Sequence, residues 1–559
     1  MNTLDLIVLF GTLLSIVAYG VYKTRGQNNI EGYLLGNNSL GWGTIGLSVM
    51  ATQASAITFI STPGQGYESG MGFVQNYFGL PIALIIVSAV FIPIFYKLKV
   101  YTAYEFLESR FDLKTRMLGA LLFLIQRGLA AGITIYAPAI ILSSILDWDL
   151  TMTIFITGGL VIVYTVSGGT KAVSITQKQQ MAVIMAGMFI TFGVIVAYIT
   201  DYVSFSSALD VAGKLDKLNT VDFDFNVEKR YTIWSGLTGG LFLALSYFGT
   251  DQSQVQRYLG GKNITESRMG LMFNAILKIP MQFFILLTGV MVYVFFIFYT
   301  PPVHFKDVSV QKLNGTPYEQ QYQELSAKYE NQLSERKNQV LQYVQEPNEL
   351  NEAKMLAADE ASKTVRQEVK DLLVKADPTI ETKDSDYVFL TFILTYLPHG
   401  LIGLLIAVIF SAAMSSSSSE INSLSSTTTV DIYRRLISKG ESKHDMLISK
   451  GLTLLWGILA ISFAILAKNS ENLIEAVNIV GSIFYGTILG IFLVAFFLKK
   501  VQGNAIFWAA MIAQITVIVF HFLTVYDVIT LGYLWYNAIG CLLTILLSGL
   551  IQLVLPRKA

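Results

Sequence analysis

The stretch SAAMSSSSSEINSLSSTTTVDIYRR, residues 411–435, decides the fold class that we expect for this chain. It continues the apolar run LIGLLIAVIF at residues 401–410 and is expected to belong to the same helix. A polar group buried in hydrocarbon without a partner costs roughly 2–7 kcal/mol, so this run of hydroxyls has to face protein, an ion or water. Neighbouring hydroxyls such as those of Ser415 and Ser416 suit a hard cation such as sodium. The alternative, close packing of small residues, does not require so many oxygens.

The composition indicates a polytopic membrane protein. The chain has 559 residues, of which 53% are hydrophobic and 14% charged, and its mean hydropathy is +0.54. Soluble and disordered chains are far more polar. A net charge of zero gives no support for nucleic-acid binding, and the single cysteine, Cys541, excludes disulfides and thiolate metal clusters. The N-terminal apolar run has an acidic residue before it and basic residues after it, so we expect a retained first helix and not a cleaved signal peptide.

A spanning helix needs about 20 mostly apolar residues. By that measure we expect about thirteen transmembrane helices, at residues 4–22, 41–61, 71–96, 117–145, 152–166, 179–199, 232–249, 271–299, 400–433, 452–467, 474–498, 505–523 and 532–555. A further half-helix is expected at residues 388–397, before Pro398.

The charges of the connections predict the orientation. One set of connections is basic, with Lys97, Arg110, Arg116, Arg257, Lys262, Arg268, Arg434, Arg435, Lys499 and Lys500 among its members. The alternate connections carry Glu68, Asp149 and Asp527, with Lys468 as the exception. The positive-inside rule then places the N-terminus outside and the C-terminus in the cytoplasm, as an odd number of spans requires. We therefore expect a multi-pass protein of the cytoplasmic membrane.

The sequence predicts three parts. Residues 1–300 hold the first eight spans, residues 301–387 form a hydrophilic extracytoplasmic insertion, and residues 388–559 hold spans nine to thirteen. The insertion is rich in strong helix formers, which predicts a helical hairpin that breaks near Pro347 and ends near Pro378. It serves either as a passive cap or as an element that docks a partner or gates access.

Two of the predicted spans are interrupted by polar and small residues. The second contains small and hydroxyl residues from Ala51 to Ser61, and the seventh contains Gly249, Asp251 and Gln252. Interrupted helices in corresponding positions of two halves indicate the midplane site of a transporter. The spacing predicts two inverted repeats of five helices, the first at about 41–199 and the second beginning at about 232.

Five stretches carry a family resemblance: YTAYEFLESRF (101–111), IYAPAI (135–140), VSGGTKAVSIT (166–176), YFGTDQSQVQRYLGGK (247–262) and the serine helix with its ending NSLSSTTTVDIY. Together they resemble the sodium/solute symporter family, which includes sodium/glucose, iodide, multivitamin, monocarboxylate, proline and sialic-acid cotransporters. The resemblance implies a LeuT-type fold and sodium-driven solute uptake by alternating access. The insertion is not part of the common pattern.

The resemblance also implies the sodium ligands. The shared sodium site falls on the carbonyls of Ala51, Ala54 and Ala412 and on the hydroxyls of Ser415 and Ser416. Five neutral oxygens hold a monovalent ion without trapping it, as release on every cycle requires.

Some family members have a second sodium site, which falls here on Ser415, Ser418, Ser419 and Gln177. Family members with that site have an aspartate where this chain has Gln177, so the departure puts binding of a second sodium ion in doubt. We consider two roles for Glu420: it supplies the missing charge, or it contacts a cytoplasmic partner near the membrane surface.

The residues that match substrate contacts of the family are Gln53, Ile57, Thr58, Tyr77, Asp251 and Lys278, and we add Arg127. Ile57, Thr58 and Tyr77 stand where sugar carriers have an acidic residue and amides, so a hexose fits poorly. An arginine inside an apolar span costs about 2.5–3.5 kcal/mol, which a substrate carboxylate or Asp251 would offset. Snorkelling of Arg127 to a membrane surface is the alternative.

We therefore expect a sodium-coupled symporter of a small organic anion such as a sialic acid, a monocarboxylate or a vitamin-like acid. The alternatives are a neutral sugar or polyol symporter and a transport-like sensor, which would need a separate signalling partner because the chain ends soon after the last span. A membrane enzyme is disfavoured, because no nucleophile, base and orienting group occur together. The coupling ion, sodium or protons, and the role of the insertion are left open.

Overall fold

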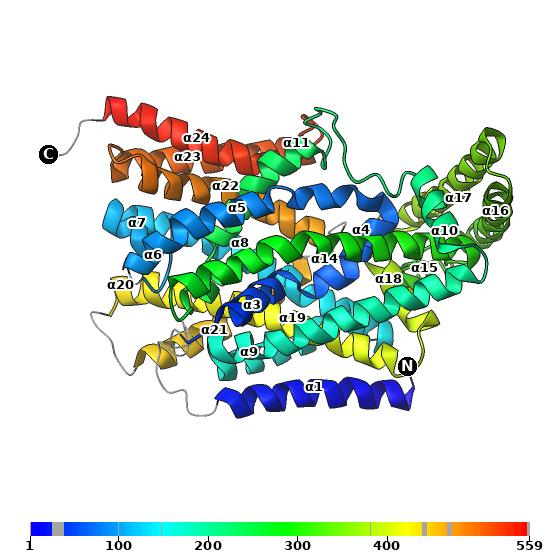
Figure 1. Cartoon of the computed structure of the whole chain (residues 1–559), viewed down its shortest axis with the longest axis horizontal. Coiled ribbons are helices and arrows are strands. Elements are labelled where there is room, and N and C mark those ends of the chain that lie inside the picture. Colours follow the sequence, from blue (N-terminus) through cyan, green and yellow to red (C-terminus); the bar gives the residue numbers. More distant parts are fainter. Residues whose placement is uncertain are drawn as a thin grey trace.

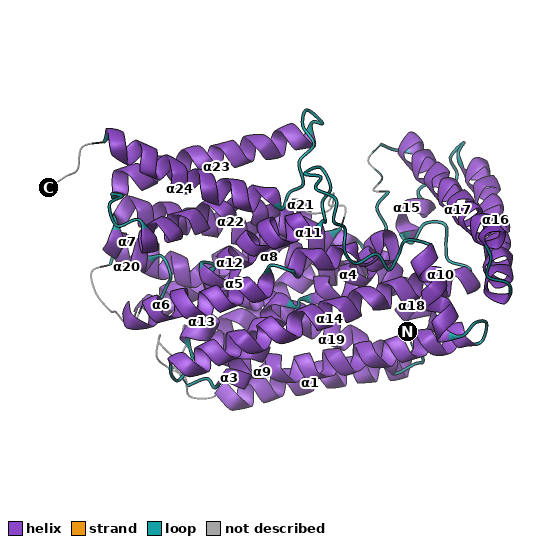
Figure 2. Cartoon of the chain, turned by 45° about the horizontal axis from the view of Figure 1, so that its top comes forward, coloured by secondary structure: helices purple, strands orange, loops and turns teal. Residues whose placement is uncertain are grey.

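The computed structural model describes residues 2–24, 39–98, 100–146, 148–378, 380, 382–438, 444–466 and 472–555. Within these ranges the regular structure is helical, apart from one isolated bridge between Leu40 and Gly261. The helices form one bundle, and a helical hairpin projects from one end of it (Figures 1 and 2). The all-α class is confirmed for this part of the chain. Lys468, the exception in the charge pattern, lies outside the described residues.

Nine helical segments of the described chain are long and apolar enough to cross a membrane, and three shorter apolar helices accompany them. All of the predicted spans coincide with helix. The regular ones are α1 (Thr3–Thr24), α8 (Leu113–Leu146), α14 (Ile264–Phe298), α21 (His444–Leu466), α22 (Leu473–Phe497), α23 (Gly503–Val525) and α24 (Trp535–Val554). Several helices begin earlier than predicted. Their first turns are polar, as at His444, and the apolar-length criterion therefore left these residues out of the predicted spans.

One predicted boundary is wrong. The structure assigns helix continuously over α9 (Leu150–Thr200), where we expected two spans, 152–166 and 179–199, with a loop between them. A straight helix of these 51 residues would be about 77 Å long, more than twice the bilayer core of about 30 Å. Of its apolar parts, Gln180–Thr200 is a candidate membrane span and Leu150–Val163 is one of the shorter apolar helices. The residues between them are polar in part but remain helical.

Both predicted interruptions are present. The second span divides into α3 (Trp42–Gln53) and α4 (Ala56–Ser69). The seventh consists of α11 (Ile233–Ser235), the π-helical η4 (Gly236–Gly240) and α12 (Leu241–Gly249), and it resumes after a break as α13 (Gln252–Leu259). The third span is irregular as well, and runs through η2 (Gly70–Tyr77), α5 (Leu80–Ile86), η3 (Val87–Phe91) and α6 (Ile92–Leu98).

The serine segment lies at the centre of the bundle. It belongs to α19 (Leu401–Thr427), which continues through η5 (Thr428–Tyr433) and α20 (Arg434–Leu436). Every residue from Ser415 to Thr427 is buried, and α19 packs against α1, α8, α9 and α21. At the start of α19 its backbone approaches α1 closely, since a Cβ atom at Gly403 would lie 2.1 Å from the carbonyl oxygen of Asp5. The hydroxyl run therefore faces protein and not lipid.

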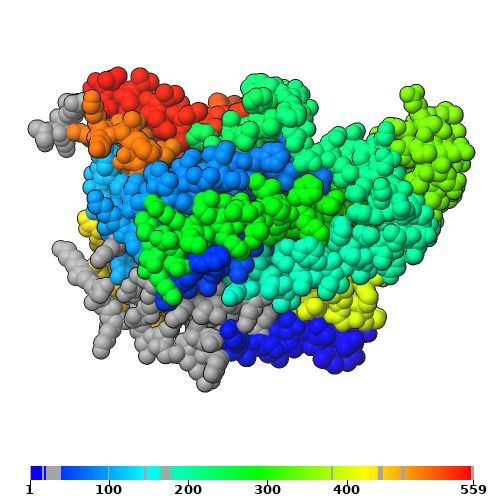
Figure 3. All heavy atoms as spheres, in the orientation of Figure 1, coloured from blue at the N-terminus to red at the C-terminus, as the bar shows by residue number. Residues whose placement is uncertain are grey.

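The insertion forms the predicted hairpin from α16 (Glu319–Gln345) and α17 (Glu349–Ala376), preceded by α15 (Asp307–Gln311). It is the green lobe at one end of the molecule in Figure 3. Buried ion pairs hold it: Arg336 Nη1 lies 3.3 Å from Asp359, and Arg366 Nη2 lies 2.7 Å from Asp384. Burial alone would raise the pKa of Asp384, but the Arg366 guanidinium holds this pKa below its usual value.

The half-helix before Pro398 is α18 (Ser385–Tyr396). Two short helices were not predicted, α7 (Glu105–Arg110) and α10 (Phe205–Lys214). The latter contacts the hairpin, since Lys214 Nζ lies 2.8 Å from Glu352.

Candidate functional site

The break between α3 and α4 opens the backbone at Ala54 and Ser55. Ala54 has φ −90° and ψ 72°, and Ser55 is extended, so the helical hydrogen-bond ladder stops here. The carbonyls at the end of α3 consequently lack the partners that a continuing helix would supply. Ala54 itself donates its N–H to the carbonyl of Met50 over 2.7 Å.

The serine helix faces these carbonyls. The Ser416 hydroxyl lies 3.4 Å from the carbonyl oxygen of Ala51 and 3.4 Å from that of Thr52. Ser415 is buried, and its hydroxyl has no hydrogen-bond partner among the described residues. Ala412 is buried one turn earlier on the same helix. A buried hydroxyl without a partner, next in sequence to one that contacts these backbone carbonyls, fits a site for a small hard cation.

Gln177 links the same two helices. The Ser48 hydroxyl donates to Gln177 Oε1 over 2.6 Å, and Gln177 Nε2 donates to the hydroxyls of Thr52 at 3.2 Å and Ser419 at 3.4 Å. The amide thus contacts one of the hydroxyls expected at a second sodium site. The Ser418 hydroxyl, another of them, is buried and has no hydrogen-bond partner among the described residues.

A cavity opens beside the α3–α4 break. Of the residues that we expected to contact substrate, Gln53, Ile57, Thr58, Tyr77 and Arg127 line it. Further polar lining comes from Thr52, Ser55, Asn76, Thr134, Tyr247, Glu420, Asn478 and Tyr485. The cavity therefore adjoins both the interrupted helix and the serine helix.

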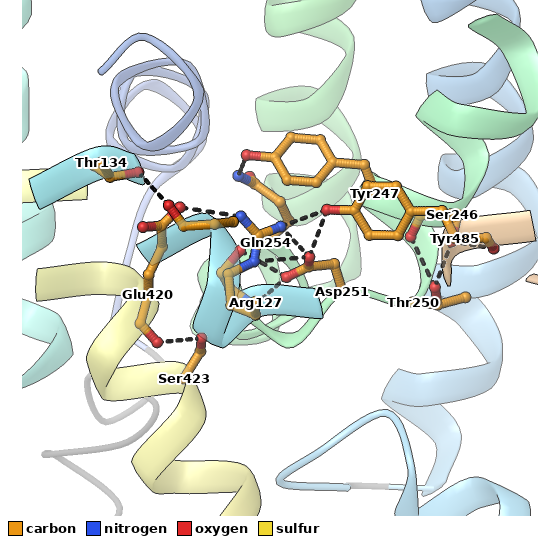
Figure 4. A network of polar contacts seen from close by, with 12 residues as sticks. Arg127, Thr134, Ser246, Tyr247, Thr250, Asp251, Gln254, Glu420, Ser423 and Tyr485 are labelled. Carbon is orange, nitrogen blue, oxygen red and sulfur yellow. Dashed lines mark hydrogen bonds and ion pairs between the residues drawn. The ribbon is translucent and has the colours of Figure 1, made fainter. Parts of the chain in front are cut away.

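Arg127 is the centre of a buried ionic network at the cavity wall (Figure 4). Its side chain is 3% exposed, so snorkelling to a membrane surface is excluded. Nε donates to Asp251 over 3.1 Å, Nη2 donates to Asp251 as well, and Nη1 donates to Glu420 over 3.0 Å. The Tyr485 hydroxyl donates to Asp251 over 2.8 Å, and the guanidinium stacks over Tyr247 with its centre 5.3 Å from the ring centroid.

The network brings together α8, the α12–α13 break and α19, which are far apart in the sequence (Figure 4). Asp251 does not line the cavity, but it pairs with the guanidinium of Arg127, which does. Glu420 points to Arg127, and no contact joins it to Gln177 within the described chain. This buried position argues against contact with a cytoplasmic partner near the membrane surface. The other role that we considered for Glu420, supply of the charge missing at Gln177, stays a prediction.

Lys278 lies outside the cavity lining. It is 1% exposed, and its ammonium nitrogen lies 5.4 Å from the ring centroid of Tyr77, which lines the cavity. No carboxylate pairs with it among the described residues. Its contact with substrate stays a prediction, as do the individual sodium ligands.

Sequence reasoning missed Asn478, Tyr485 and Tyr247 as lining residues. A signal was present, because Asn478 and Tyr485 are polar residues within an apolar span and lie seven residues apart, on one helix face.

A discontinuous helix, a buried hydroxyl helix and a cavity between them define a secondary transporter whose ion and solute sites adjoin. A sequence profile of the sodium:solute symporter family matches residues 33–321 and 373–513, and the chain belongs to this family. The unmatched interval falls within the hairpin. The chain is therefore a sodium-coupled symporter with the multi-pass fold of its family.

Individual relatives agree. The chain is 29% identical over 491 residues to the sodium-coupled monocarboxylate transporter 1 of Xenopus laevis, and the aligned region covers 87% of this chain and 67% of that protein. It is 26% identical over 560 residues to the sodium/sialic acid symporter NanT of Aliivibrio fischeri, covering 98% and 93% of the two chains. A solved structure of a Na⁺-coupled sialic acid symporter in a substrate-bound outward-open state matches with a TM-score of 0.75 and 24% identity, over 99% of this chain and 98% of that one. This match confirms the LeuT-type fold.

Proposed function

We propose that this symporter imports a monovalent organic carboxylate together with one sodium ion. The observation that carries the proposal is the charge balance of the cavity. Arg127 supplies one positive charge and Lys278, when protonated, a second, whereas Asp251 and Glu420 supply two negative ones. Within the described part of the chain these are the charged side chains that line the cavity or contact a lining side chain, and with Lys278 protonated their formal sum is zero.

Sodium brings one positive charge to this neutral, buried site. An excess charge is costly at membrane depth, and an anion in the cavity restores neutrality. The carboxylate and the ion then favour each other's binding by the same coupling free energy. A neutral sugar or polyol would leave the sodium charge uncompensated.

The site offers cationic contacts from two directions. Arg127 reaches the cavity wall with its carboxylate partners already bound, whereas Lys278 lies behind Tyr77 with no such partner. Reorientation of Tyr77 would bring the ammonium of Lys278 to a substrate carboxylate. Two of the relatives are, by their names, carriers of monocarboxylates and of sialic acid, and both substrates are carboxylates.

The sodium ion would bind the carbonyls of Ala51, Ala54 and Ala412 and the hydroxyls of Ser415 and Ser416. Contact between the end of α3 and α19 across 3.4 Å supports this assignment. The ion would join the two helices and fix the break that forms one wall of the cavity. Solute binding would therefore follow sodium binding.

Gln177 supports a stoichiometry of one sodium ion per solute molecule. Its amide nitrogen donates to Thr52 and Ser419, so these hydroxyls face a neutral donor and not a carboxylate that would attract a second ion. We assign the protein to the cytoplasmic membrane with the N-terminus and the hairpin outside. The clustering of Arg110, Arg434, Arg435 and Lys499 on the opposite connections supports this orientation.

The test is thermal unfolding of the purified protein in sodium chloride and in potassium chloride at equal ionic strength. Sodium at a hundredfold excess over Kd stabilises the folded state by about 2.7 kcal/mol. We expect a sodium-specific shift for the wild type and for Ser423→Ala, and none for Ser416→Ala. Pyruvate, lactate and N-acetylneuraminate are then added in each salt, and the true substrate raises the unfolding temperature further only with sodium. Equal unfolding temperatures of the wild type in both salts would refute the proposal.

A further inference from the structure

A second hollow lies on the outside of the bundle, between α3, α9 and α14, with about 1010 Å³ of empty space. Its floor is formed by three buried methionines, Met50, Met181 and Met281. Its rims carry exposed apolar side chains, since Phe189 is 56% exposed and Leu277 is 38% exposed. Apolar side chains exposed on membrane-spanning helices face lipid, so this groove opens to the bilayer.

The two ends of the groove differ in character. Lys178 is at one end, just before the apolar segment Gln180–Thr200 begins. Phe189 and Phe284 close the other end, with their ring centroids 4.5 Å apart. Of the described residues that line the groove, Lys178 alone is charged. A cation at the mouth of an apolar groove is complementary to an anionic amphiphile.

The length of the groove matches one lipid leaflet. Lys178 and Phe189 are eleven positions apart on α9, which corresponds to about 16 Å along a helix. One leaflet contributes about half of the hydrocarbon core, or about 15 Å. An acyl chain that starts at the level of Lys178 therefore ends near the phenylalanine pair.

The methionine floor suits such a chain. Methionine side chains are flexible and polarizable, so they adapt to the irregular surface of an acyl chain. Pro280 also lines the groove, and it interrupts the regular hydrogen bonding of α14 at this point.

We propose that this groove binds one anionic phospholipid, with its phosphate at Lys178 and an acyl chain along the methionine floor. The lipid belongs to the leaflet at the N-terminal end of α3, which is cytoplasmic in the proposed orientation. Because Met50 precedes Ala51 in the chain, the bound lipid touches α3 beside the carbonyls that face the serine helix. The site depends on neither the identity of the solute nor its charge.

The experiment is native mass spectrometry of delipidated protein titrated with phosphatidylglycerol or phosphatidylcholine. One lysine near a membrane surface contributes about 1 kcal/mol towards anionic lipid, which corresponds to about fivefold in affinity. We expect the wild type to retain the first phosphatidylglycerol about fivefold more strongly than the first phosphatidylcholine. Lys178→Gln should lose this preference. Lys262→Gln, which removes an exposed lysine from the connection before α14, should keep it.

A second variant tests the groove itself. Ala182 lines it and is exposed, so Ala182→Phe fills the groove without disturbing the core, and we expect this variant to lose the first bound lipid of either kind. Gel filtration and the sodium-dependent unfolding temperature verify that each variant is folded. An unchanged phosphatidylglycerol preference in Lys178→Gln, or an unchanged first lipid in Ala182→Phe, would overturn the proposal.

Discussion

Replacing Glu420 by glutamine tests the charge balance of the site. Glu420 lies one turn beyond Ser416 on α19 and contacts Arg127 at 3.0 Å. Glutamine keeps an oxygen that accepts from the guanidinium, and the stronger Arg127–Asp251 contacts remain. The substitution therefore removes one negative charge with little change of shape, and the formal charge of the cavity becomes +1.

The expected loss of sodium affinity follows from Coulomb's law. Glu420 lies one helical turn, about 5.4 Å along the axis, beyond Ser416. Because the Glu420 side chain extends away from Ser416 towards Arg127, we take a charge separation of about 8 Å. At an effective dielectric constant of about 20, their attraction is about 2 kcal/mol. Its loss weakens sodium binding about thirtyfold. The excess positive charge should at the same time make carboxylate binding less dependent on sodium.

The assay measures the sodium concentration that gives half of the maximal thermal stabilisation. The sodium concentration for half-maximal solute uptake into proteoliposomes is measured next. Glu475→Gln is the matched control, because Glu475 pairs with Arg230 at 2.8 Å and lies outside the cavity lining. We expect the control to behave like the wild type. A sodium midpoint for Glu420→Gln within threefold of the wild type would refute the charge argument, provided that the variant folds normally.

Three further results are expected. Gln177→Asp places a carboxylate beside Ser419, so the Hill coefficient for sodium should rise from about 1 towards 2, and an unchanged coefficient would argue against a second-site role of this position. Asp251→Asn leaves Arg127 with Glu420 alone, and breaking a buried pair costs about 3–5 kcal/mol, so the unfolding temperature should fall steeply; a loss below about 1 kcal/mol would show that the pair is solvated. Because the folded-state pKa of Asp384 lies below its usual value, its stabilisation of the hairpin is complete above about pH 5 and is lost as the pH falls further. Protection of residues 319–376 from hydrogen exchange should decline in that range for the wild type and decline less for Asp384→Asn, in which Asp359 still titrates; an equal decline in both proteins would argue against a role of Asp384.

Much of the fold was predictable, because long apolar stretches in the sequence indicate membrane-spanning helices. The breaks at Ala54 and at Asp251 were also predictable, since clustered polar residues and a carboxylate are unusual in a continuous span. The loop within α9 was wrongly predicted. Adjacent glycines lower helix propensity and lysines interrupt the apolar pattern, but the structure keeps these residues helical. The short helix α10 escaped prediction because it is amphipathic and only ten residues long.

Several residues that line the cavity could be predicted from the sequence, but the contacts between their side chains could not. Gln53, Ile57, Thr58 and Tyr77, which match family substrate contacts, do meet at one cavity together with Arg127, whereas Asp251 and Lys278 do not line it. The pairing of Arg127 with Glu420 joins residues 293 positions apart, and no local pattern contains that information. Tertiary packing alone decides that Glu420 turns to the arginine and that Gln177 turns to Ser419.

The most direct test of the central claim is the charge moved in each transport cycle. One sodium ion and one carboxylate carry no net charge, so uptake of the identified substrate into proteoliposomes should require a sodium gradient. Its initial rate should be the same with and without an inside-negative potassium diffusion potential set by valinomycin. A sodium-dependent uptake that such a potential accelerates severalfold would mean that net positive charge enters with the solute, and it would contradict the account.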